Sequence, residues 1–112
     1  RRHKKLTYRV ISLCEALPNK KICRIIEDQL LRSVFSAAAN YRSACKAQSP
    51  KAFTAKLSIA FEEIDETLFW LEAVDELQLL PSGKLGDVLN ETDELTRILA
   101  ASRKTSQTKN IK

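Results

Sequence analysis

Residues 20–50 read KKICRIIEDQLLRSVFSAAANYRSACKAQSP and contain the longest helical pattern of the chain. Apolar side chains recur there every three or four positions, at Ile22, Ile26, Leu30, Val34, Ala37, Tyr41 and Ala44. This spacing predicts a helix over residues 20–46 with one apolar face, too long for a strand. Ser49 followed by Pro50 predicts the start of the next helix, because serine caps free amides and proline suits the first turn.

Three further segments show the same spacing and are bounded by residues that stop helices. The predicted helices cover residues 4–17, 50–79 and 84–103, with breaks at Pro18 and at Pro81. Because each connection is only a few residues long, every helix must turn back beside its predecessor. The sequence therefore predicts an all-α fold, an up-down-up-down antiparallel four-helix bundle, in one domain over residues 1–103. Residues 104–112 are polar, and we expect them to form a disordered tail.

The composition supports a single helical domain. The chain has 112 residues with two Gly, three Pro and a 44% hydrophobic share, which excludes a turn-rich all-β protein and a disordered chain. Its apolar runs are far shorter than the roughly 20 residues needed to cross a bilayer, so we expect a cytoplasmic protein with no membrane partner. The chain begins at Arg1 and contains no Met, and we expect the natural protein to start further upstream.

The patterns required for catalysis or for metal binding are missing from the sequence. Cys14, Cys23 and Cys45 lie in apolar helical patterns, as expected for reduced thiols that pack as small hydrophobic groups. The single histidine, His3, lies in a terminal basic run. A zinc site, a di-iron bundle site and a Cys–His nucleophile all need histidines that the predicted helix cores lack. We therefore predict that the protein is no enzyme and uses neither a metal nor a cofactor.

Two predicted helices carry more apolar side chains than one buried face requires. Leu31 and Phe35 lie off the main face of the helix over residues 20–46, and Phe69 and Trp70 lie off that of the next helix. Large side chains of this kind favour an interface with a second copy or with another partner. The alternative is that these side chains fold into the edges of the bundle.

Antiparallel pairing of these two helices predicts polar contacts between them. Residues whose numbers sum to about 95 lie level around the turn at residues 47–49, which places Arg32 near Glu63 and Gln29 near Glu66. We expect these pairs to be structural, contributing at most about 1 kcal/mol each where they are exposed.

Charge is distributed unevenly along the chain. Residues 1–56 hold 13 Lys or Arg against three acids, and residues 57–112 hold six against 11. We expect the basic side chains of the first two helices to gather at one end of the bundle and to bind the phosphates of nucleic acid. They are Lys4, Lys5, Arg9, Lys20, Lys21 and Arg24. The alternatives are a solvated face or pairing with acids of a neighbouring helix. No base-reading device is visible, so binding through the backbone is expected.

Several short runs resemble one bacterial family. They are QLLRS at residues 29–33, ANYRSA at 39–44, DET at 65–67 and WLE at 70–72, with further matches through the fourth predicted helix. In these runs the chain resembles the four-helix bundle proteins encoded in 23S rRNA intervening sequences, whose relatives include the accessory variability proteins of diversity-generating retroelements. The resemblance covers nearly the whole chain.

The resemblance implies a homopentamer with a basic surface that faces RNA. It also implies two possible roles. One is a non-catalytic accessory protein that binds nucleic acid, RNA in particular. The other is a scaffold for a partner enzyme such as a reverse transcriptase, with Phe69 and Trp70 as anchors.

Overall fold

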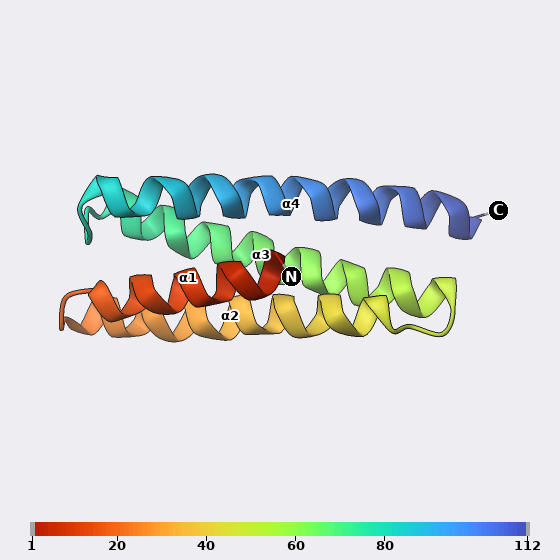
Figure 1. The fold of residues 1–112 in the computed structure, drawn as a ribbon, viewed down its shortest axis with the longest axis horizontal. Coiled ribbons are helices and arrows are strands. Elements are labelled where there is room, and N and C mark those ends of the chain that lie inside the picture. Colours follow the sequence, from red (N-terminus) through yellow and green to blue (C-terminus); the bar gives the residue numbers. More distant parts are fainter. Residues whose placement is uncertain (1, 112) are drawn as a thin grey trace.

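The computed structural model describes residues 2–111, which form four helices joined by short turns (Figure 1). The helices are α1 (Arg2–Ala16), α2 (Lys21–Cys45), α3 (Pro50–Glu76) and α4 (Ser82–Ile111). Each helix runs antiparallel to its predecessor, and no strand occurs in the described range. The all-α, up-down-up-down four-helix bundle predicted from the periodicity is confirmed.

Local chemistry accounts for the turn between α2 and α3 and for the end of α3. The Ser49 hydroxyl accepts a hydrogen bond from the amide of Ala52 at 3.1 Å, and Pro50 occupies the first helical position. α3 ends at Glu76, before the predicted residue 79, because Gln78 takes a left-handed backbone conformation with φ of 53°. A helix cannot continue through that conformation.

The last helix corrects the prediction of a disordered tail. α4 continues through residues 104–111, because it runs antiparallel to a 27-residue α3 and must be long to cover that helix. One contact within this extension and one just before it join α4 to α3. The hydroxyls of Thr54 and Ser106 form a hydrogen bond, and the Arg103 guanidinium lies 4.2 Å from the centre of the Phe61 ring. Stacked cations of this kind contribute about 0.5–1 kcal/mol at exposed sites.

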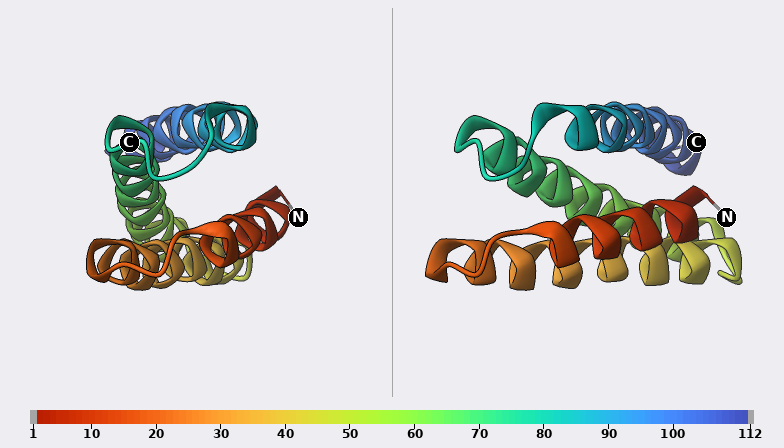
Figure 2. Two further views of the ribbon diagram at one scale, coloured as in Figure 1. Left: turned by 90° about the vertical axis from the view of Figure 1, so that its left-hand side faces the viewer. Right: turned by 60° about the vertical axis from the view of Figure 1, so that its left-hand side comes forward.

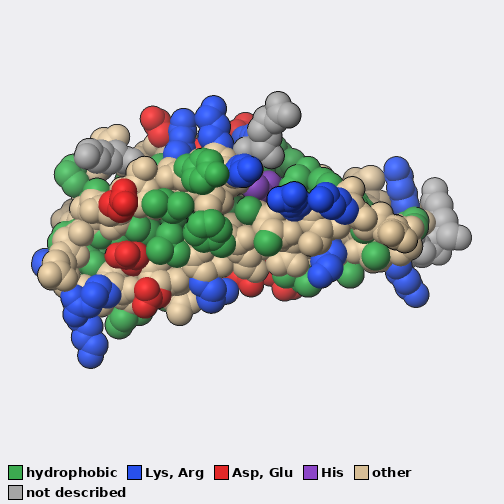
Figure 3. Space-filling model, turned by 60° about the horizontal axis from the view of Figure 1, so that its bottom comes forward, with side chains coloured by type: hydrophobic (Ala, Val, Ile, Leu, Met, Phe, Trp, Pro, Cys, Tyr) green, Lys and Arg blue, Asp and Glu red, His purple; other side chains and the backbone are tan. Residues whose placement is uncertain are grey.

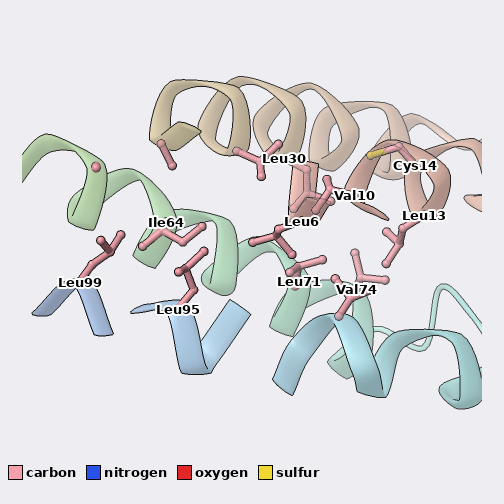
Figure 4. Close-up of a cluster of buried hydrophobic side chains, with 14 of the residues drawn as sticks. Leu6, Val10, Leu13, Cys14, Leu30, Ile64, Leu71, Val74, Leu95 and Leu99 are labelled. Carbon is pink, nitrogen blue, oxygen red and sulfur yellow. The ribbon is translucent and has the colours of Figure 1, made fainter. Parts of the chain in front are cut away.

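The core lies where the apolar faces of all four helices meet. In Figure 4, Leu6, Val10 and Leu13 of α1 point towards side chains of the other three helices, including Leu30, Leu71 and Leu95. All six are buried, and burial of a leucine stabilises the fold by about 1.5–3 kcal/mol. One polar contact lies inside this core, because Thr67 donates a hydrogen bond to the Ser33 hydroxyl at 2.8 Å.

The bundle has four helices along only part of its length. α1 has 15 residues and is about 22 Å long, whereas α4 has 30 residues and is about 45 Å long. α1 packs on α2 and, to a smaller extent, on α4 (Figure 2). The N-terminus therefore lies near the middle of the molecule (Figure 1). There the His3 ring stacks on Tyr41 with ring centres 4.4 Å apart. Beyond this stack only α2, α3 and α4 continue.

Candidate nucleic-acid interface

The structure separates the six basic residues that were predicted to gather at one end. Lys20, Lys21 and Arg24 lie at the turn between α1 and α2. Lys4 and Lys5 lie at the other end of α1, about 18 Å away along the helix axis. The expectation of a single basic end formed by these residues is wrong, because α1 carries its own lysines away from the turn.

The arginines of this set have partners within the molecule. Arg9 pairs with Glu91 at 3.2 Å, across the interface between α1 and α4, and Arg24 donates to the Asn19 side chain at 2.8 Å. A second pair, between Arg2 and Glu94 at 2.7 Å, supports the same helix interface. Pairing with acids of a neighbouring helix, the alternative weighed from the sequence, therefore holds for Arg9.

The lysines of the set face solvent. Lys4, Lys5, Lys20 and Lys21 are exposed, and within residues 2–111 none of them forms an ion pair. Lys20 and Lys21 are nevertheless followed by two acids, Glu27 and Asp28, about two turns further along α2. The net positive field at this turn is therefore reduced.

The four predicted interface residues fall into two places. Phe69 is 59% exposed and meets Trp70 edge to face, with ring centres 5.0 Å apart, on α3. Leu31 and Phe35 lie one turn apart on α2, where Phe35 is 50% exposed and Leu31 packs partly against the core. Figure 3 faces α1 and α2 and shows hydrophobic side chains gathered between charged groups. Exposure supports a partner surface for the two phenylalanines, while Leu31 and Trp70 pack at the edge of the bundle.

The predicted polar pairs form one network centred on Arg32. Its guanidinium donates to Glu63 at 3.1 Å, to Glu66, and to the Gln29 side chain at 3.1 Å. The Trp70 indole also donates to Glu66, at 3.0 Å. The predicted contact between Gln29 and Glu66 is replaced, because the arginine lies between them and bonds to both. The hydrogen bond from Arg32 lowers the pKa of the Glu66 carboxyl below its ordinary value.

A second basic region, absent from the predicted set, lies where α1 does not reach. We call it the acid-free end, comprising residues 42–58 of α2 and α3 and residues 98–109 of α4. It holds seven basic residues and no Asp or Glu. The basic residues are Arg42, Lys46, Lys51, Lys56, Arg103, Lys104 and Lys109. The signal was present in the sequence, because no acid occurs between Asp28 and Glu62 or after Glu94.

A groove of about 760 Å³ opens in the acid-free end. Its walls come from the end of α2, the start of α3 and the last turns of α4, including Cys45, Phe53 and Lys109. The groove contains four hydroxyl side chains, those of Ser49, Ser102, Thr105 and Ser106. A concave, polar and basic surface of this kind can bind an extended anion.

The cysteines differ in exposure. Cys14 and Cys23 are buried, and Cys45 is exposed. Burial, together with nearby Glu27 and Glu15, raises the pKa of the Cys14 thiol to about 12, so this group stays protonated at neutral pH. In the part of the chain that the structure describes, no three His, Cys, Asp or Glu side chains are grouped to hold a metal ion. Nor is any helix of that part long and apolar enough to span a membrane.

Comparison with known proteins identifies a family and a similar solved structure. Residues 1–101 match the sequence model of the 23S rRNA-intervening sequence protein family. The structure is similar to the crystal structure of a protein of unknown function from the S23 ribosomal protein family of Bacteroides thetaiotaomicron VPI-5482. That match has a TM-score of 0.82 and 30% sequence identity over 92% of this chain and 95% of the other. No curated protein matches the chain.

Proposed function

This chain belongs to the 23S rRNA-intervening sequence protein family, and we propose that it is a non-catalytic homo-oligomer that binds nucleic acid. RNA is the favoured ligand, since the family is named for a segment of ribosomal RNA. Binding goes through the phosphate backbone, and the protein acts as an accessory factor.

The observation that carries this proposal is the separation of charge along the molecule. Eleven of the 14 acids lie between Glu62 and Glu94, a stretch that holds one basic residue, Lys84. The acid-free end and the exposed lysines of α1 and the first turn lie outside that stretch. Separated basic surfaces on a chain of net charge +5 attract polyanions over distances of about 10 Å at 0.1 M salt.

Self-association is supported by two exposed aromatic side chains on the first two helices. Tyr8 of α1 is 57% exposed and Phe35 of α2 is 50% exposed. Figure 3 faces these two helices and shows hydrophobic side chains gathered on that side of the molecule. A ring of five subunits, the number that the family resemblance implies, buries this face and repeats the basic surfaces around its axis.

Light scattering combined with nucleic-acid titration tests the proposal. We expect a single oligomeric species, and RNA binding that weakens at least tenfold between about 50 and 200 mM salt. A monomer contradicts the oligomer, and absence of RNA and DNA binding at about 50 mM salt contradicts nucleic-acid binding as a whole. Replacing Phe35 by Ser tests the interface separately, and it should produce smaller species that remain helical.

A second candidate function is a scaffold for a partner enzyme such as a reverse transcriptase. Phe69 favours it, because this exposed ring packs only edge to face on Trp70 beside the Arg32 network. A reverse transcriptase gene next to the gene for this chain supports the scaffold, and a position inside an rRNA gene argues against it. With the purified enzyme in hand, Phe69→Ala should abolish complex formation and leave the oligomer and RNA binding unchanged.

A further inference from the structure

The groove of the acid-free end lies in line with the surface of α2 and α4 that α1 covers. On α4, Glu91 and Glu94 face α1, since they pair with Arg9 and Arg2. The same helical stripe passes through residues 98, 101, 102, 105 and 109, and the last four of these line the groove. On α2, Tyr41 contacts His3 of α1, and Ala44 and Cys45 follow one turn later in the groove wall. The groove is therefore about as wide as one helix.

The lining of the groove differs from the lining of the site under α1. Where α1 lies, the buried side chains of the bundle are mainly leucine, isoleucine and valine. In the groove, four hydroxyls and the Gln48 amide stand among small apolar groups and one aromatic ring, that of Phe53. Such a lining offers hydrogen bonds to an extended polar chain, and it contains none of the leucine, isoleucine or valine side chains that pack against a helix in the rest of the bundle.

Helix stability accounts for two of the three lysines around the groove, but not for the third. Lys46 and Lys109 lie at the C-terminal ends of α2 and α4, where the helix dipole favours a cation. Lys51 lies in the first turn of α3, where the dipole favours an acid, yet that turn contains none. A lysine that opposes the local preference, in a region without a single acid, indicates selection for binding an anion.

We propose that this groove holds the sugar-phosphate backbone of single-stranded RNA, with Lys46, Lys51 and Lys109 binding phosphates around its rim. This inference rests on the proposed function and names its site. Single strands fit a groove of one helix width, which an RNA duplex is too broad to enter. Hydroxyls such as Ser102 and Thr105 face the strand, and Phe53 supplies an aromatic surface of the kind on which bases stack. The exposed lysines at the turn between α1 and α2 add weaker contacts, because Glu15, Glu27 and Asp28 flank that turn in the sequence.

Two charge-matched triple variants test the site. The first combines Lys46→Glu, Lys51→Glu and Lys109→Glu, and the second combines Lys20→Glu, Lys21→Glu and Arg24→Glu. Both change the net charge equally. Binding of an oligouridine of about 12 nucleotides is measured from about 50 to 200 mM salt. For the first triple we expect at least a tenfold rise in Kd and a salt slope about two units smaller, and for the second a rise of about threefold.

Alkylation of Cys45 gives an independent reading, because it is the exposed cysteine and lies in the groove. We expect oligouridine to slow alkylation at Cys45 in the native protein at least fivefold, and Cys45→Ser to remove the signal. Circular dichroism establishes that each variant is folded.

The outcomes separate the site from the function. Native protein that does not bind oligouridine overturns the proposed function and the site with it. If the native protein binds oligouridine and the second triple variant weakens binding as much as the first, the site is overturned and the proposed function stands. Alkylation of Cys45 at the same rate with and without RNA also overturns the site. This outcome includes the case in which a second copy or a helix already covers the groove.

Discussion

The half of the bundle that contains α1 and the acid-free end are built from the same three long helices, yet they present different surfaces. In the first half, α1 closes the core with Leu6, Val10 and Leu13, and its arginines pair with acids of α4. In the acid-free end no fourth helix follows, and basic and hydroxyl side chains remain open to solvent. The comparison shows that the length of α1 decides which part of the α2–α4 surface is available for binding.

The acid-free end is ordered without a fourth helix because its side chains are small and form hydrogen bonds with neighbouring helices. The buried Ala44 lets α2 approach α3 closely, and the Ser106 hydroxyl bonds to Thr54 across the α3–α4 contact. Less apolar area is buried there than in the other half, so each side chain contributes less to the free energy of unfolding. The variants below test this difference, beginning with the largest expected effect.

Replacing Leu71 by Ala should lower the free energy of unfolding by about 3 kcal/mol, because the side chain is fully buried between helices and leaves a cavity. Phe53→Ala, in the acid-free end, should cost about 1 kcal/mol, since its ring is only partly buried beside the groove. Urea unfolding followed by circular dichroism measures both. Equal losses would show that the two parts are packed alike and would break the comparison.

His3, at the boundary of the two regions, should make stability depend on pH. Burial, with the positive charges beside it, lowers the pKa of His3 from 6.5 to about 4. The unfolded chain therefore binds a proton that the folded chain excludes as the pH falls from about 6.5 towards 4. The free energy of unfolding should drop by about 2 kcal/mol over that window, and this contribution is fully present above it.

His3→Phe is the matched control for that experiment, because it keeps an aromatic ring over Tyr41 and removes the proton. It also removes the buried Nε2 atom, which lacks a hydrogen-bond partner within the described residues. Thermal unfolding at pH 7 and pH 4 should show a smaller difference for the variant. The same difference in both proteins would exclude His3 as its cause.

Arg32→Gln should have the smallest effect, a loss of at most about 1 kcal/mol, since the network is largely exposed and screened by water. The loss should shrink further at about 1 M salt. Glu62→Gln, which removes a neighbouring charge that forms no ion pair within residues 2–111, is the control. A salt-independent loss of several kcal/mol would show that the network holds the two helices together in the way the buried core does.

Much of the fold could be predicted from the order of residues alone. The buried stripes of α2 and α3 contain Ile26, Leu30, Leu57 and Ile64, all of which the three-and-four spacing selects. The level pairing of Arg32 with Glu63 also follows from an antiparallel turn of known length, and the structure confirms it. Residues 104–111 could not be assigned in this way, because their helical state depends on the length of α3 rather than on their own polar composition.

The candidate site was less accessible to sequence reasoning. Local charge counting found the basic N-terminal half but grouped Lys4 with Lys20, which the direction of α1 holds apart. Phe53 and Lys109, 56 positions apart in the chain, line one groove only because α3 and α4 are antiparallel. Periodicity and punctuation are local properties, so they establish the four helices and their inner faces. Which charges become neighbours, and where a helix-wide groove stays open, depends on helix lengths and directions in space, and tertiary packing alone settles that.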